Sequence, residues 1–211
     1  MKGAIFDLDG TLLDSMTMWR NLDRVFFESF GIEYEPSMTK KIAGMTLREA
    51  AEFYHTEYNL DKSADDIVKD WEDYLFDVYA NELVLKDNAK EYIEMLKAKG
   101  IKMCIATLTD KQMAISALKH NGVYDNFEFV MTVDDVGKSK MTPDIYIESA
   151  KKMGLEISDC VVYEDTLHAV TTAKKAGFKV VGVYDKWANH DISGACDLFI
   201  HNFSEIMGET L

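Results

Sequence analysis

Short apolar runs recur along the chain and alternate with segments of helical period. The first run, 3–6, stops at Asp7. Runs that are apolar throughout, rather than at every second position, are typical of parallel strands covered on both faces. We therefore predict a parallel sheet whose further strands lie at 101–106, 129–133, 160–163 and 179–183, with an edge strand at 198–200.

Helical patterns with recognisable ends lie between these runs. Segments 89–99, 111–120 and 167–176 are each followed by glycine or Asn-Gly, which commonly ends a helix. The pair Thr142-Pro143 predicts another helix, because threonine can cap exposed N–H groups and proline suits the first helical position. This βαβα alternation predicts the α/β fold class.

Residues 15–80 interrupt the alternation with three amphipathic helical patterns and no strand pattern. In the first pattern Trp19, Leu22, Phe26 and Phe30 recur at helical spacing. Such a stripe indicates the core of a helical bundle. We predict a core domain from 1–14 and 81–211, with an inserted all-helical domain at 15–80.

Charge and composition narrow the class of ligand. The 211 residues carry a formal net charge of −14, which argues against binding to a nucleic-acid backbone and favours a small ligand. No apolar stretch approaches the roughly 18 residues of a membrane span, and the beginning of the chain lacks the pattern of a signal peptide. The three cysteines are far apart and show no CxxC spacing. We expect a cytoplasmic monomer that binds neither membranes nor nucleic acids.

Two carboxylates follow the first predicted strand. Asp7 and Asp9 are two residues apart, so an extended chain would point both side chains the same way, with Cα atoms about 6.6 Å apart. At that separation one carboxylate could attack phosphorus while the other handles the proton of the leaving oxygen. Gly10 permits the sharp turn that must follow.

Other strand ends carry matching chemistry, and in open parallel sheets ligands bind beyond those ends. Thr107 and Thr109 flank Leu108 ahead of a helix, where hydroxyl and N–H groups can hold an anion. Lys140 stands three residues before Pro143, where an ammonium could neutralise a phosphoryl group.

The fourth strand ends at Glu164-Asp165, whose oxygen ligands suit Mg²⁺. Adjacent residues of an extended strand point to opposite faces, so only one of the two should reach a metal unless the chain bends there. We take Asp165 as the first choice and Glu164 as the second.

Four segments together resemble the motifs of the haloacid dehalogenase-like superfamily. They are DLDGT at 7–11, Ala106-Thr107, KMTPD at 140–144 and VVYEDTLHAVTTAKKAG at 161–177. The helical insertion after the first motif is similar to the cap domain of the β-phosphoglucomutase and phosphatase type.

This resemblance implies a Rossmann-like core with a helical lid and a reaction through an aspartyl phosphate. Asp7 would attack phosphorus, and Asp9 would protonate the leaving alcohol and then activate water. The carboxylate of Asp7, the backbone carbonyl of Asp9 and Asp165 would bind Mg²⁺, with Lys140 beside them. Thr107 and the N–H of Leu108 would hold the remaining phosphoryl oxygens.

Three positions depart from the family pattern or compete within it. The mutases usually have a histidine near the position of Trp19, and its absence here disfavours a mutase. Arg48 lies near a cap arginine of such enzymes with a register shifted by one, so it is either a substrate contact or an ordinary helix-surface arginine. Lys138 competes with Lys140, whose spacing to Pro143 matches the motif better.

The favoured function is therefore a Mg²⁺-dependent phosphatase acting on a sugar phosphate or a similar small phosphorylated metabolite. A β-phosphoglucomutase-like mutase would share Asp7, Asp9 and the metal. A non-catalytic phosphate-binding protein is a third hypothesis. The presence of Asp9, which a binding protein does not need, favours catalysis.

Overall fold

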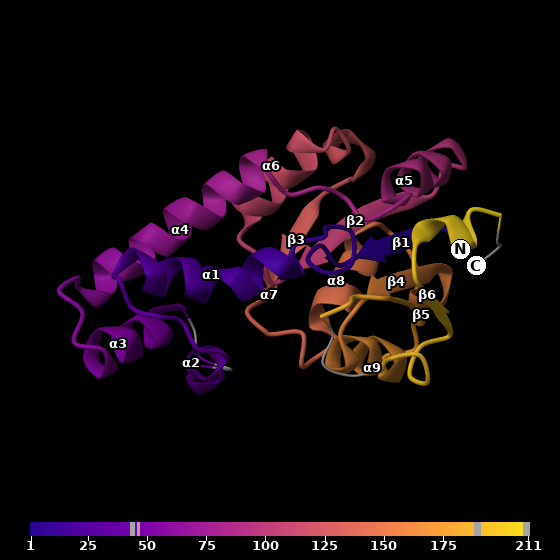
Figure 1. Cartoon of the computed structure of the whole chain (residues 1–211). Coiled ribbons are helices and arrows are strands. Elements are labelled where there is room, and N and C mark those ends of the chain that lie inside the picture. Colours follow the sequence, from indigo (N-terminus) through magenta and orange to yellow (C-terminus); the bar gives the residue numbers. More distant parts are fainter. Residues whose placement is uncertain (43–44, 46, 188–190, 209–211) are drawn as a thin grey trace. The chain divides into compact units, whose positions relative to one another are not determined.

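The computed structural model describes residues 1–42, 45, 47–187 and 191–208. Its centre is a sheet of six parallel strands in the order β3-β2-β1-β4-β5-β6 (Figure 1). The strands are β1 (Gly3–Phe6), β2 (Lys102–Thr107), β3 (Val130–Thr132), β4 (Cys160–Glu164), β5 (Lys179–Val183) and β6 (Leu198–Ile200). The predicted α/β fold with a parallel sheet is confirmed, including the edge strand.

The central strands lie in the core because they carry apolar residues on both faces of the sheet. Every residue of β1 and β4 is buried. Phe6 of β1 stacks on Tyr163 of β4 with ring centroids 4.3 Å apart, on the face opposite the one that receives Ile5. Since adjacent strand residues point to opposite faces, continuous apolar runs can pack on helices from both sides.

Helices cover both faces of this sheet (Figure 1). Helices α5 (Ala89–Ala98) and α6 (Lys111–His120) lie on one side, and α8 (Asp144–Lys152) and α9 (Leu167–Lys175) lie on the other. This division follows from right-handed crossovers that run in opposite directions from the centre of the sheet. Shorter elements complete the unit: η1 (Tyr124–Asn126), α7 (Val133–Val136), η2 (Ile157–Asp159) and η3 (Phe203–Ile206).

The strand order reverses between β1 and β4, because the chain builds β2 and β3 on one side of β1 before it returns to the other. In open α/β sheets, ligands bind beyond the carboxyl ends of the strands at such a reversal. Asp7 directly follows β1 and Asp165 directly follows β4. The topology therefore brings these two carboxylates to the same edge of the sheet.

Residues Thr17–Val78 form a compact unit of their own, and Met1–Met16 together with Tyr79–Leu211 form the α/β unit. The helices of the insertion are α1 (Met16–Ser29), α2 (Pro36–Lys41), α3 (Leu47–Glu57) and α4 (Ala64–Asn81). The six-residue α2 was not predicted, because so short a segment shows no apolar stripe. The domain boundaries at 14/15 and 80/81 stay a prediction.

Aromatic side chains fill the centre of the helical unit. Phe26, Tyr54 and Trp71 contact one another, because the ring centroids of Tyr54 and Trp71 lie 5.8 Å and 5.0 Å from that of Phe26 and 6.0 Å from each other. All three side chains are buried. The stripes that the sequence shows therefore belong to a packed helical core.

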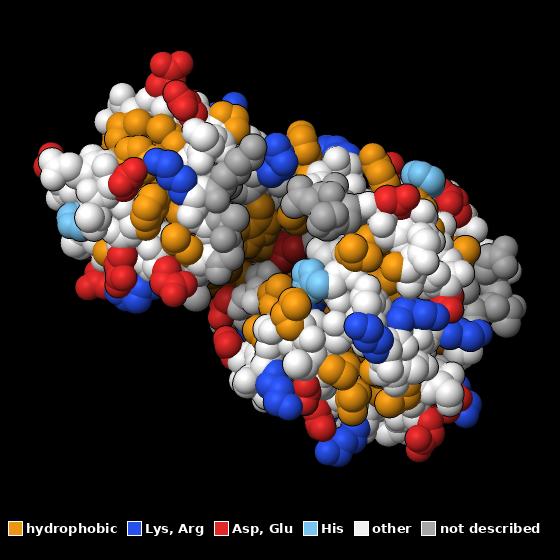
Figure 2. All heavy atoms as spheres, turned by 90° about the horizontal axis from the view of Figure 1, so that it is seen from below, with side chains coloured by type: hydrophobic (Ala, Val, Ile, Leu, Met, Phe, Trp, Pro, Cys, Tyr) orange, Lys and Arg blue, Asp and Glu red, His pale blue; other side chains and the backbone are white. Residues whose placement is uncertain are grey.

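Surface charges are mixed on the face shown in Figure 2, where basic side chains are interspersed with acidic ones. No helix in the described part of the chain combines the length and the apolar character that a membrane span requires.

Two helix starts show how local sequence signals succeed or fail. Helix α8 begins at Asp144 with Pro143 in the N-cap position, and no side chain caps it. The predicted Thr142 cap is wrong, because this hydroxyl donates to the Ser139 carbonyl at 3.3 Å instead. At α6, which follows β2, Asp110 accepts hydrogen bonds from two N–H groups of the first turn.

We predict that Asp110→Ala lowers the free energy of unfolding by about 1 kcal/mol, the usual value of an N-cap side chain. The reason is that the N–H groups of Gln112 and Met113 lose their acceptor, now 2.8 and 3.1 Å away. Urea denaturation measures the change. Asp110→Asn is the matched control, because asparagine caps about as well as aspartate. An equal loss in both variants would contradict the capping role.

Candidate active site

The end of β1 places Asp7 at the centre of a buried polar network. The backbone N–H of Asp7 still donates to the Tyr163 carbonyl at 3.0 Å, which fixes the residue beside β4. Its side chain is buried, and its Oδ1 accepts a hydrogen bond from Lys140 Nζ. Its Oδ2 accepts a hydrogen bond of 3.4 Å from the Thr11 hydroxyl.

Lys140 reaches this network from the loop before α8. Its side chain is only 3% exposed, and Nζ also donates to Glu164 Oε1 at 2.7 Å. The Tyr146 hydroxyl donates to the same Oε1 at 2.6 Å. Lys138, the alternative to Lys140, instead forms an ion pair of 2.6 Å with Asp144 in a solvent-exposed position. Of these two lysines, the structure brings Lys140 to the buried carboxylates.

Asp7, Glu164 and Asp165 each offer a carboxylate oxygen within a group whose atoms lie within 4.8 Å of one another. All three residues are buried. Both Glu164 and Asp165 thus lie in this group, and which of them would ligate a metal stays a prediction. Strand β4 ends at Glu164, so the alternation of an extended strand no longer applies to Asp165.

The electrostatics of this group fit a cation. Burial and the neighbouring Glu164 raise the pKa of Asp7 well above its usual range, and the same two causes raise the pKa of Asp165 to about 7. Burial alone would lower the pKa of Lys140, but the attraction of Asp7 and Glu164 outweighs it and raises the pKa. One buried ammonium thus stands among three carboxylates. These hard oxygen donors, with negative charge in excess, are those that Mg²⁺ takes in proteins.

Asp9 has different partners. The Tyr79 hydroxyl donates to its Oδ1 at 2.5 Å, and the Thr109 hydroxyl donates to its Oδ2. Tyr79 stands near the end of α4 but belongs to the α/β unit. The two-residue spacing predicts that the side chains of Asp7 and Asp9 point the same way, but these two side chains contact different partners. Strand β1 ends at Phe6, before either aspartate.

The remaining candidate residues are Thr107, Leu108 and Arg48. Thr107 is buried at the end of β2, and its hydroxyl accepts the backbone N–H of Thr109 at 3.0 Å. Leu108 is exposed beside it. Arg48 lies in the helical unit and forms an exposed ion pair of 2.6 Å with Asp65. Its role as a substrate contact stays a prediction.

The sequence patterns predict no role for Tyr79, Thr11 or Tyr146. Thr11 belongs to the DLDGT segment, and its hydroxyl also donates to Asp165 Oδ1 at 3.3 Å. Tyr146 follows Pro143 by three residues, so its place on α8 was available as a signal. Tyr79 follows an aromatic stripe that indicates only a helical core, and nothing in the sequence separates it from that stripe.

Comparison with known proteins places these features in a family. A family model described as haloacid dehalogenase-like hydrolase matches residues 4–183. The chain is 27% identical to the phosphorylated carbohydrates phosphatase of Thermotoga maritima, over 87% of this chain and 85% of that protein.

A second relative is the bifunctional riboflavin kinase/FMN phosphatase of Arabidopsis thaliana, at 29% identity over 85% of this chain. The match covers 48% of that relative, about half its length. A crystal structure of HAD hydrolase, family IA, variant 3 from Entamoeba histolytica superposes with a TM-score of 0.77 and 26% identity, covering 98% of this chain and 95% of the other.

We predict that Gly10→Ala disturbs this site far more than a similar substitution elsewhere. Gly10 has φ +76°, and an added Cβ would lie 2.3 Å from Asp165 Oδ2. The expected loss of unfolding free energy is about 2 to 4 kcal/mol, from backbone strain plus displacement of Asp165. Urea denaturation measures the stability, and calorimetric titration with Mg²⁺ measures the site.

Gly100→Ala is the matched control, because Gly100 has φ +73° and an added Cβ there would meet nothing within 4 Å. It shares the backbone strain of Gly10→Ala but not the collision. The close approach of Gly10 to Asp165 is refuted if the two variants lose equal stability and both bind Mg²⁺ like the wild type.

We predict that Mg²⁺ raises the melting temperature more at pH 8 than at pH 5. In the metal-free protein the folded-state pKa of Asp165 is raised from 3.8 to about 7, so the folded state holds a proton that the unfolded state releases. This group's contribution to stability is therefore present below its ordinary pKa and is lost as the pH rises through about 7. At pH 8 the carboxylate is ionised, and Mg²⁺ need not displace a proton.

Differential scanning fluorimetry in buffers of equal ionic strength, with Mg²⁺ and with EDTA, measures this effect. A Mg²⁺-induced shift that is as large at pH 5 as at pH 8 would contradict the protonation of this site.

Proposed function

Because this chain belongs to the haloacid dehalogenase-like hydrolase family, we propose that it is a Mg²⁺-dependent phosphatase of small phosphorylated metabolites. The observation that carries the proposal is the buried side chain of Asp7. It accepts a hydrogen bond from Lys140 and lies close to the carboxylates of Glu164 and Asp165. A sugar phosphate or a similar phosphomonoester is the substrate class. The two relatives, a bifunctional riboflavin kinase/FMN phosphatase and a phosphorylated carbohydrates phosphatase, support this class.

In the first step, a carboxylate oxygen of Asp7 forms a bond to phosphorus, and the bond from phosphorus to the ester oxygen breaks. Asp9 donates a proton to that leaving oxygen, so the alcohol departs neutral. Lys140 lowers the repulsion between the anionic nucleophile and the anionic phosphoryl group, because its ammonium already contacts Asp7. The product of this step is an aspartyl phosphate on Asp7.

In the second step, water attacks the phosphorus of the aspartyl phosphate, and Asp9 accepts the proton of that water. The bond between phosphorus and Asp7 breaks, which releases phosphate and restores the free carboxylate. The contacts of Asp9 suit both of its roles, since the Tyr79 and Thr109 hydroxyls contact its two side-chain oxygens and thereby fix the position of its carboxyl group. Fixing the base in this way reduces the reorganisation needed for proton transfer.

The metal would be held by the carboxylates of Asp7 and Asp165 and the backbone carbonyl of Asp9. When bound, Mg²⁺ supplies positive charge that offsets repulsion between the carboxylates and the phosphoryl oxygens. Glu164 already accepts hydrogen bonds from Lys140 and Tyr146 on one oxygen. Its main role is therefore to orient Lys140, with direct ligation to the metal as its second role.

The end of β2 would hold the transferring phosphoryl group. Thr107 offers its hydroxyl, and the chain turns after it toward the N-terminus of α6. The backbone N–H of Leu108 is the second donor in this proposal. N–H groups before a helix are well suited to anions.

We predict that the wild type releases phosphate from members of a panel of sugar phosphates, nucleotides and p-nitrophenyl phosphate, and that EDTA abolishes the release. Asp7→Asn should lower kcat by about 10³-fold or more, since the amide keeps the shape of the side chain but is not a nucleophile. Asp134→Asn, on the exposed first turn of α7, is the control variant and should match the wild type. Colorimetric phosphate assay measures all of these rates.

Other outcomes separate the competing functions. Full phosphate release by Asp7→Asn would exclude Asp7 as the nucleophile. Isomerised sugar phosphate, detected by ³¹P NMR without net phosphate release, would identify a mutase. Mg²⁺ binding without turnover on any substrate of the panel would favour a phosphate-binding protein.

A further inference from the structure

Tyr146 contacts the active-site network, although the proposed reaction gives it no role. The residue lies in the first turn of α8 and is fully buried. Its hydroxyl donates to Glu164 Oε1 at 2.6 Å. Lys140 Nζ donates to the same oxygen at 2.7 Å and also to Asp7 Oδ1. The hydroxyl of Tyr146 and the ammonium of Lys140 thus share one acceptor.

The ring of Tyr146 lies close to Lys140 as well. The ring centroid is 5.9 Å from Lys140 Nζ. Cation–π attraction extends to about 6 Å, so this distance is at its limit. Tyr146 therefore meets both partners of one buried ion pair, Lys140 through its ring and Glu164 through its hydroxyl.

The core holds the Tyr146 side chain in place. The backbone N–H of Tyr146 donates to the Pro143 carbonyl at 3.1 Å. Its ring packs edge-on against Phe178, with centroids 6.2 Å apart, in the hydrophobic cluster of this face of the sheet. Lys140, in contrast, reaches its partners through a flexible four-carbon stem. The fixed hydroxyl can therefore define the place of the Glu164 carboxylate, and this carboxylate can define the place of the ammonium.

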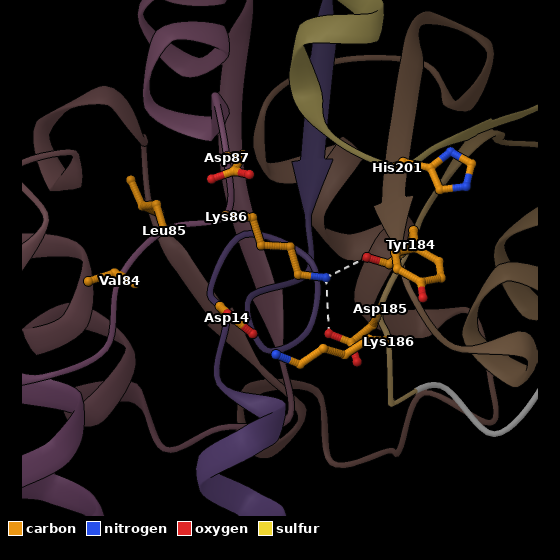
Figure 3. Close-up of a pocket in the computed structure, with 9 residues that line it drawn as sticks. All are labelled: Asp14, Val84, Leu85, Lys86, Asp87, Tyr184, Asp185, Lys186 and His201. Carbon is orange, nitrogen blue, oxygen red and sulfur yellow. Dashed lines mark hydrogen bonds and ion pairs between the residues drawn. The ribbon is translucent and has the colours of Figure 1, made fainter.

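A second lysine shows a comparable arrangement with a different donor (Figure 3). Lys86 is largely buried in the wall of a pocket of about 230 Å³, where it pairs with Asp185 Oδ2 at 3.1 Å. The other oxygen of Asp185 accepts the backbone N–H of Trp187 at 2.7 Å. In both places the carboxylate that pairs with a lysine accepts a further hydrogen bond. At Glu164 the further donor is a side chain, so a substitution can remove it and leave the backbone unchanged.

The simplest explanation of the contact is that a buried hydroxyl needs a partner. The identity of the partner points further. The acceptor is a carboxylate oxygen that also pairs with the ammonium on Asp7, and hydrogen bonds to charged groups are stronger than those between neutral groups. Loss of the hydroxyl would therefore free the oxygen on which the place of Lys140 depends.

We propose that Tyr146 is a positioning residue of the active site. Its hydroxyl fixes Glu164 Oε1, and this oxygen fixes the ammonium of Lys140 against Asp7. The inference rests on the proposed function, because it concerns the step in which Asp7 attacks phosphorus. Tyr146 itself takes no part in the making or breaking of bonds. A small displacement of Lys140 is enough to slow that step, because catalytic groups act only in their productive geometry.

The variant Tyr146→Phe tests this role, because it keeps the ring beside Lys140 and removes only the hydroxyl. The kcat should fall about tenfold while KM stays within about twofold of the wild type, since the lost positioning acts on the transition state rather than on substrate binding. Steady-state phosphate release at saturating Mg²⁺, with a substrate from the panel, measures both constants. A kcat of Tyr146→Phe within about twofold of the wild type would overturn the inference.

Tyr92→Phe is the matched control. The Tyr92 hydroxyl lies 2.6 Å from the Tyr163 hydroxyl in the buried core, and Tyr92 belongs to α5 on the other face of the sheet. This substitution removes a contact of the same length, so the two variants should lose similar stability in thermal unfolding with EDTA. Tyr92→Phe should keep the kcat of the wild type. An equal loss of kcat in both variants would indicate general loosening and would also overturn the inference.

The double variant Tyr146→Phe/Lys140→Met separates the positioning of Lys140 from any other effect. Adding Tyr146→Phe should lower the residual kcat of Lys140→Met by less than about twofold, because no ammonium is left to position. A further loss of about tenfold would show that Tyr146 acts by another route. If Lys140→Met does not fold, the kcat values of the two single tyrosine variants decide.

Hydrogen exchange of the Lys140 ammonium gives a readout without turnover, by NMR of protein that contains ¹⁵N-labelled lysine. The exchange should be at least about fivefold faster in Tyr146→Phe than in the wild type or Tyr92→Phe, because the ammonium is held less firmly. Unchanged exchange would overturn the inference. Faster exchange in Tyr146→Phe, combined with no phosphate release by the wild type, would instead defeat only the proposed function.

Discussion

The contact on which the site depends is the buried ammonium of Lys140, which donates to both Asp7 and Glu164. Three carboxylates gathered at one sheet edge repel one another, and burial makes this repulsion stronger than it would be in water. Lys140 relieves it from the loop before α8, while β1 and β4 supply the carboxylates. The ammonium thus ties three segments that are distant in the sequence into one network. Removing one partner of a buried ion pair is strongly destabilising, because it leaves a charge without compensation.

This network also shows why the acidic chain can accept an anionic substrate. A formal net charge of −14 disfavours phosphate at long range, so binding must rely on charges close to the site. Lys140 is one such charge, and the excess of carboxylates around it leaves room for a bound cation. The two effects are coupled, since the same negative excess that attracts Mg²⁺ would repel phosphate without it.

The sequence predicts the sheet and the helices of the α/β unit well, because continuous apolar runs and glycine ends are local signals. The six strands and the helices ending near Gly100, Asn121 and Gly177 were all found from such signals. The direction of the side chains beyond a strand end was not predictable in the same way. The apolar run marks the end of β4 near Glu164, but it does not show that the carboxylates of Glu164 and Asp165 converge beyond that end.

Contacts that join distant segments were also beyond the reach of sequence patterns. The two hydroxyl groups that donate to Asp9 come from residues 79 and 109. The left-handed backbone of Asn88, with φ 61° just before α5, is likewise not marked by a sequence pattern. Those contacts give Asp7 and Asp9 different surroundings although they are two residues apart. Asp7 faces an ammonium and other carboxylates, whereas Asp9 faces two neutral hydroxyl donors. Two nearby carboxyl groups can serve different steps when their environments differ in this way, one as nucleophile and the other in proton transfer. The chain leaves β1 after Phe6, so the two aspartates no longer follow the alternation of the strand, and Gly10 in its left-handed conformation permits the turn directly after Asp9.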